Sequence, residues 1–111
     1  MVTAETAVVL PVLLLVLAAV VAAVVVVGAQ LRCVDAAREG ARAAARGDAP
    51  DAVRALVARV APDGARTEVA VGDGGVRVTV RAEVSPLGPV DLGVDVEATA
   101  VARLEPGVAG G

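Results

Sequence analysis

The first feature of the chain is an uncharged apolar run from Ala7 to Ala29. A run of about 23 residues is long enough to cross a hydrocarbon core of about 30 Å as a helix. The competing interpretation, a signal peptide, has a shorter apolar segment after a positively charged start. Here the start carries Glu5 and no basic residue. The pattern therefore predicts one transmembrane helix, kinked or shortened at its N-terminal end by Pro11.

Helical signals continue beyond the apolar run. The segment Gln30–Arg46 is rich in alanine and arginine, so we expect the helix to extend out of the membrane and to stop at Gly47. Asp48 is then expected to cap a second helix, Pro50–Ala61. The apolar residues of that helix recur at helical spacing: Val53, Leu56, Val57 and Val60.

The remaining residues alternate between apolar and polar, which is typical of strands with one buried face. Residues 72–75 form a turn sequence between the first two strands, and a loop at residues 85–89 precedes a third strand. That strand is expected to begin at Val90 and to bend at Gly93. The apolar positions are Thr67, Val69, Val71, Val76, Val78, Val80, Ala82 and Val84, and then Val90, Leu92, Val94, Val96, Ala98 and Ala100.

The predicted fold class is α+β: a long N-terminal transmembrane helix that extends out of the membrane, a short second helix and a three-stranded antiparallel sheet. We expect residues 1–29 to be the N-terminal segment with the span, residues 30–105 a small domain, and residues 106–111 a disordered tail.

Composition narrows the function. Hydrophobic residues make up 57% of the chain, aromatic residues and histidine are absent, and the formal net charge is -3. Nucleic-acid binding is disfavoured because it needs a basic face and stacking platforms. No nucleophile–base pair or metal-ligand cluster is visible in the sequence. We therefore expect no catalytic, cofactor-binding or metal-binding residues, no cofactor and no small-molecule substrate. Asp91, Asp95 and Glu97 are expected on one solvated strand face rather than in a calcium site.

Several residues after the span have two interpretations. Arg38, Arg42 and Arg46 form a basic stripe, which either contacts lipid headgroups or partner proteins or is simply a solvated helix face. A second face carries only small residues, which allow another helix to approach closely. It consists of Ala37, Gly40, Ala41, Ala44 and Ala45. Cys33 is expected to be a small packed side chain rather than half of an intermolecular disulfide.

Two segments resemble a known family. Met1–Pro11 (MVTAETAVVLP) looks like the processed start of a TadE-like protein, and Ala36–Ala45 (AAREGARAAA) is similar to the segment that follows the membrane helix in that family. TadE-like proteins are minor pilins, or pseudopilins, of the tight-adherence type IV pilus system. The resemblance is strong over residues 1–47, and the short β-rich region also matches in size and place.

The resemblance implies a structural and assembly role in an adhesive pilus, with no catalysis. It implies a single-pass protein of the bacterial inner membrane, a pilin-like domain outside the cytoplasm, and possible entry into the pilus. The partners it implies are other pilin-like subunits, the pilus assembly machinery and a prepilin peptidase, with Met1 as the processing position. It further implies that Glu5 pairs with the N-terminal amine of a neighbouring subunit. The alternative is a charge lying among headgroups at a helix N-terminus.

Two questions stay open at this point. The family's precursor carries a basic leader ending in glycine, which the printed sequence does not include before Met1. In addition, arginines that follow a span favour a cytoplasmic C-terminus, contrary to the orientation that the resemblance implies. The alternative function is therefore a single-pass accessory or regulatory subunit with a cytoplasmic domain, unrelated to pili. A membrane-tethered enzyme is less favoured.

Overall fold

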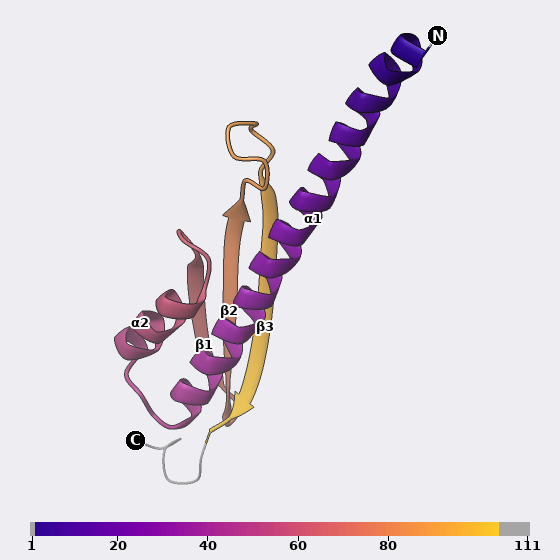
Figure 1. The fold of residues 1–111 in the computed structure, drawn as a ribbon. Coiled ribbons are helices and arrows are strands. Elements are labelled where there is room, and N and C mark those ends of the chain that lie inside the picture. Colours follow the sequence, from indigo (N-terminus) through magenta and orange to yellow (C-terminus); the bar gives the residue numbers. More distant parts are fainter. Residues whose placement is uncertain (1, 105–111) are drawn as a thin grey trace.

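The computed structural model describes residues 2–104 and has two helices and a three-stranded sheet (Figure 1). This confirms the predicted α+β class. Met1, the predicted processing position, and the predicted tail at residues 106–111 lie outside the described residues. The elements along the chain are α1 (Val2–Ala45), α2 (Pro50–Val60), β1 (Arg66–Gly72), β2 (Gly75–Val84) and β3 (Val94–Arg103).

Helix α1 is continuous for 44 residues, so the predicted extension beyond the apolar run is confirmed. It passes through Pro11 without interruption, and the shortening expected there does not occur. At its C-terminal end Gly47 adopts a left-handed conformation (φ 91°). Its amide donates to the carbonyl of Ala44 at 3.0 Å, and the Asp48 amide donates to that of Ala43 at 3.1 Å. This is the glycine stop that the sequence predicts.

The prediction that Asp48 caps α2 is wrong. The residue at the N-cap is Ala49, which has no capping side chain. Asp48 lies one residue too early because its amide already takes part in closing α1. Its carboxylate instead accepts a hydrogen bond from Arg46 Nη2 at 3.2 Å. Pro50 at the first helical turn offsets the missing cap, since its φ is already helical.

The sheet has the order β1-β2-β3 with both pairs antiparallel. Asp73 and Gly74 connect β1 to β2 with positive φ values of 52° and 73°. Such a turn matches the twist of a hairpin, as the sequence predicts. The prediction that the third strand begins at Val90 is wrong. β2 ends at Val84, whose partner is Val94, so the preceding residues have no strand beside them.

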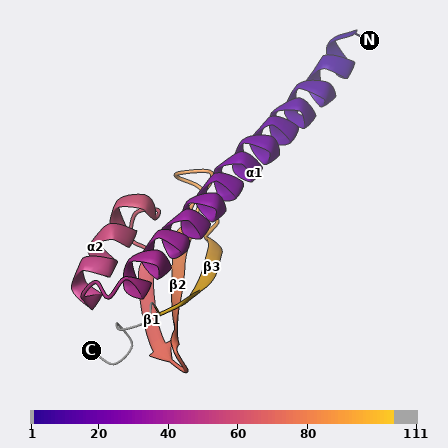
Figure 2. The same cartoon turned by 90° about the horizontal axis from the view of Figure 1, so that it is seen from below.

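One face of the sheet is covered by the second half of α1 (Figures 1 and 2). Helix α2 packs against that part of α1 and makes a smaller contact with β1. The core between them contains valine, alanine and the single cysteine. Its buried members are Ala29, Cys33, Ala36, Ala37, Ala41, Ala43, Ala45, Val53, Val57, Ala61, Val76, Val78, Val80, Ala82 and Val96. The predicted inward face of β2 is thus confirmed.

Gly40 lies at a close approach between these layers. A Cβ atom at this position would lie 2.7 Å from Val57 Cγ2 of α2 and 3.1 Å from Val78 Cγ1 of β2. Both neighbours are stiff, β-branched and fully buried, so neither has room to move. A side chain at residue 40 would therefore push α1 away from both of its partners.

We expect Gly40→Ala to destabilise the domain by about 1–2 kcal/mol, because the overpacking cost exceeds the gain in helix propensity of about 1 kcal/mol. The matched control is Gly28→Ala, since a Cβ atom there has no neighbour within 4 Å. The measurement is the rate at which a thiol reagent labels Cys33 in the full chain in detergent. Faster labelling of the Gly40 variant alone is expected; equal rates for both variants would contradict the steric account.

Cys33 has no exposed surface, which agrees with the predicted packed side chain. Burial raises the pKa of its thiol above the ordinary value of 9.0, and the nearby Arg32 charge opposes part of this shift. The folded state therefore holds the neutral thiol at pH values where the unfolded chain has released the proton. The stability from this difference is fully present below pH 9 and is lost as the pH rises through the folded pKa.

We expect the free energy of unfolding to fall above about pH 9, by up to about 1.4 kcal/mol per pH unit. The test is clean because the chain has no lysine, tyrosine or histidine that would titrate in the same range. Urea unfolding followed by far-UV circular dichroism, in detergent at several pH values, measures it. The Cys33→Ala variant should be less stable but insensitive to pH in this range; an equal slope in both proteins would assign the effect elsewhere.

Candidate functional site

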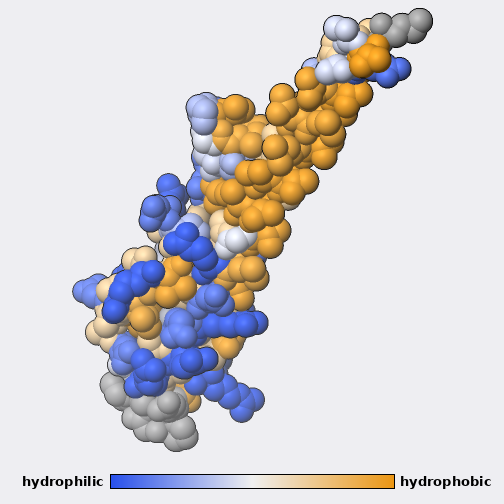
Figure 3. Space-filling view, in the orientation of Figure 1, coloured by the Kyte–Doolittle hydropathy of each residue, from blue (hydrophilic) through white to orange (hydrophobic). Residues whose placement is uncertain are grey.

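The first half of α1 projects from the domain, and after its polar first turns it carries only apolar residues as far as Ala29 (Figures 1 and 3). Among residues 2–104, α1 is the helix long and apolar enough to cross a membrane, and its most apolar 18 residues are entirely unburied. The exposed large hydrophobic side chains of α1 are Val2, Val8, Val9, Leu10, Val12, Leu13, Leu14, Leu15, Val16, Leu17, Val20, Val21, Val24, Val25, Val27 and Leu31. A helix that is hydrophobic on every side needs a lipid or protein environment around it.

Glu5 is exposed in the first turn of this helix, at the end far from the domain. The described residues give it no ion-pair partner, although its place near the helix N-terminus favours a negative charge. The neighbouring Thr6 hydroxyl donates to the Val2 carbonyl at 2.9 Å and so remains within the helix. Glu5 is thus the charged group at the edge of the apolar stretch.

The small-residue face is used inside the chain. Ala37 and Ala41 are buried, Ala44 is half-buried, and Gly40 contacts the valines of α2. The close helix approach that this face predicts is therefore made with α2 of the same chain. It leaves the lipid-compatible half of α1 as the surface available to other helices.

The basic stripe is exposed along its whole length. Arg42 Nη1 lies 3.6 Å from Glu39 Oε1, and Arg46 Nη2 lies 3.2 Å from Asp48 Oδ2. Arg38 has no ion-pair partner among the described residues. These are solvated pairs of low energy, which fits the interpretation as a water-facing helix surface.

Two polar residues at the exit of the apolar run have roles that the pattern did not reveal. The Gln30 amide donates to the Glu97 carbonyl at 2.8 Å and accepts from the Glu97 amide at 3.3 Å, so it pairs with the edge of β3. Arg32 donates to the last carbonyl of α2, at Val60 (3.3 Å), and to the carbonyl of the C-cap residue Ala61 (3.0 Å). A cation at a helix C-terminus is favourable. The sequence signal that could have revealed these contacts is that Gln30 and Arg32 are polar residues directly after an uncharged run.

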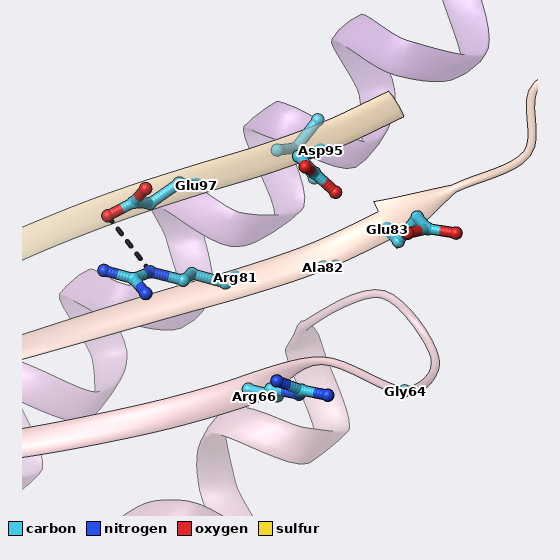
Figure 4. Close-up of a pocket in the computed structure, with 8 residues that line it drawn as sticks. Gly64, Arg66, Arg81, Ala82, Glu83, Asp95 and Glu97 are labelled. Atoms are coloured by element: carbon cyan, nitrogen blue, oxygen red, sulfur yellow. Dashed lines mark ion pairs between the residues drawn. The ribbon is translucent and has the colours of Figure 1, made fainter. Parts of the chain in front are cut away.

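The uncovered face of the sheet carries charged side chains around a surface cavity of ≈ 460 Å³ (Figure 4). Arg81 Nε lies 3.3 Å from Glu97 Oε1, whereas Arg66, Glu83 and Asp95 are separate from that pair. Asp91 lies in the loop before β3, so the expectation that it shares a strand face with Asp95 is wrong. Among the described residues no group of three His, Cys, Asp or Glu side chains is placed to hold a metal ion.

We expect Arg32→Ala to lower the free energy of unfolding by about 1 kcal/mol, because two carbonyls at the C-terminus of α2 lose a charged donor. The control is Arg38→Ala on the same helix, where an exposed arginine without an ion-pair partner is removed and little change is expected. Urea titrations of both variants in detergent provide the comparison. Similar losses in the two variants would mean that the Arg32 hydrogen bonds do not stabilise the domain.

Comparison with known proteins finds a family match for the N-terminal part of the chain. Residues 1–42 match the family model described as TadE-like protein. No curated protein matches the chain. No solved structure matches it either. The matched segment contains the projecting apolar half of α1, Glu5, Gln30, Arg32 and the first part of the small-residue face. The TadE-like resemblance predicted from the sequence is thus confirmed over residues 1–42, where the chain is similar to that family.

Proposed function

We propose that the protein is a minor pilin or pseudopilin of a tight-adherence type IV pilus. In this role it is a structural and assembly component that acts through packing of α1 with other pilin-like helices. The observation that carries the proposal is the fully exposed apolar half of α1, with Glu5 at its far end, inside the segment that matches the TadE-like family.

An anchor alone would need only length and apolarity. A carboxylate at the edge of a membrane helix is costly unless it is paired. A neighbouring subunit's N-terminal amine would supply the opposite charge, and a buried pair of this kind also sets the register between two helices. Glu5 therefore supports an assembly role over a plain anchor.

The continuity of α1 supports the same proposal. The helix that would lie among its neighbours is also the layer that covers the sheet, without a hinge between the two parts. Gly40 holds this layer against α2 and β2. A register chosen by packing of the apolar half would therefore fix the position of each domain in an assembly.

The proposal places the domain outside the bacterial inner membrane and includes processing by a prepilin peptidase before Met1. The arginines after the span favour the opposite orientation. In the folded domain, however, Arg32 caps α2 and Arg42 and Arg46 pair with acidic neighbours. Arg32 therefore has a structural role that is independent of topology, and Arg42 and Arg46 have acidic neighbours in the domain whichever side of the membrane it lies on. A single-pass accessory subunit with a cytoplasmic domain is the second candidate.

We expect Glu5→Ala to abolish or strongly reduce piliation while leaving membrane insertion intact, since the apolar run is unchanged. The measurement is the count of pili by electron microscopy in cells whose own copy is replaced, together with membrane fractionation. Glu39→Ala, which removes a carboxylate from the domain part of α1, is the matched control and should leave piliation normal.

A topology reporter at the C-terminal end accompanies both variants. Normal piliation with Glu5→Ala would refute the pairing role. A cytoplasmic reporter signal in the unaltered protein would refute the pilin proposal itself and favour the accessory subunit.

A further inference from the structure

The domain begins where the apolar half of α1 ends. Val26 is partly buried against the core and Ala29 is buried within it. The predicted span, residues 7–29, therefore overlaps the first residues that contact the domain. Because α1 is continuous here, no linker separates the two parts. A domain joined in this way lies directly against the headgroup layer of any bilayer that α1 crosses.

The β2–β3 loop, residues 85–93, lies on the membrane side of the domain. It extends from the end of the sheet toward the level of the N-terminal half of α1 (Figure 1), and the view from below shows it beside the middle of that helix (Figure 2). The base of the loop and α1 line one surface cavity of ≈ 410 Å³, with Val84 and Ser85 opposite Val24, Val25 and Gly28. The loop thus starts level with the last turns of the apolar helix.

The reach of the loop is bounded by its length. An outward and return path of nine residues extends at most about 16 Å beyond the strand ends. Along a helix that distance corresponds to about 11 residues. Backbone hydrogen bonds within the loop, such as Gly88 to Ser85 at 3.3 Å, keep it more compact than this limit. Its tip therefore lies beside the C-terminal part of the apolar run.

The side chains of the loop suit a bilayer interface. Val90 and Leu92 are apolar, yet each is 52% exposed and neither belongs to the core. Figure 3 shows apolar surface on this end of the domain, near the apolar helix. The loop has one charge, Asp91, between these two residues. A carboxylate is tolerated among headgroups but is costly in hydrocarbon, so it limits the depth of insertion.

We propose that the β2–β3 loop is a second membrane contact, in which Val90 and Leu92 lie at the boundary between headgroups and acyl chains. The inference rests on the proposed insertion of α1, and its occupant is lipid rather than another protein. The polar residues at the cavity rim, Arg32, Asp63 and Glu83, would then lie at headgroup level. Two contacts instead of one would fix the tilt of the domain on the membrane.

The test uses the full chain in vesicles of phosphatidylethanolamine and phosphatidylglycerol. Single cysteines that replace Leu92, Val71 and Leu14 are labelled with an environment-sensitive fluorophore. Cys33 is fully buried, so the unaltered chain is the control for background labelling. Val71 is the matched control, since it is 66% exposed but lies next to the β1–β2 turn at the opposite end of the sheet. Leu14 reports insertion of α1.

We expect the Leu92 probe to show blue-shifted emission and to be quenched by lipids that carry a quencher near the headgroup, but protected from aqueous iodide. The Val71 probe should be quenched by iodide and not by lipid. A Leu92 probe that behaves like the Val71 probe, while the Leu14 probe is quenched by lipid, overturns the loop contact alone. A Leu14 probe that lipid does not quench overturns the insertion on which both proposals rest.

Self-association is a separate outcome. If the Leu92 probe is protected from both quenchers, and protection disappears when the protein is diluted in lipid, the loop contacts another copy of the chain and the lipid proposal is refuted. As a second variant, Leu92→Ser with Val90→Ser should leave folding unchanged, because neither side chain is in the core. A further probe at residue 87 of the same loop should be protected from iodide without these substitutions and quenched by iodide with them. Unchanged protection there would contradict the proposal.

Discussion

The structure depends on the close contact that α1 makes with its own domain around Gly40. There the helix lies against α2 and β2 at once, with a hydrogen atom where any other residue has a side chain. The chain has no aromatic residues, so its core is assembled from valine, alanine and one cysteine. Small side chains fill space only when backbones approach closely. A thin core of this kind is stable because the layers are near one another.

One helix therefore meets two different requirements. Its first half is apolar on every side, as a helix among lipids or other apolar helices must be. Its second half has a buried small-residue face and an exposed charged face, as a helix on a sheet must have. The change occurs within one or two turns, where Gln30 and Arg32 contact β3 and α2. Polar side chains at this point tie the helix to both elements.

Much of this arrangement follows from periodicity. The uncharged run, the glycine stop at Gly47 and the alternation along β2 each reflect local rules, and the structure follows them. The predictions from the sequence were wrong where contacts with a neighbouring element determine the local structure. Val90 and Leu92 continue an alternating pattern, yet no strand lies beside them. Asp48 is a good capping residue, but closing α1 already uses its amide. The contacts of Arg32 and Gln30 depend on the tertiary fold, which periodicity does not encode.

The candidate site also combines features that are visible in the local sequence with features that depend on the tertiary fold. Glu5 and the apolar run are visible in the sequence because a charge beside an uncharged run is a local feature. Whether the small-residue face serves an external or an internal partner depends on where α2 folds, and the structure shows that α2 takes it. External packing is then confined to the first half of α1 and to surfaces beside it. Since no hinge separates that half from the domain, any contact that orients the helix also orients the sheet. A membrane contact at the β2–β3 loop would act on the same rigid unit from a second point.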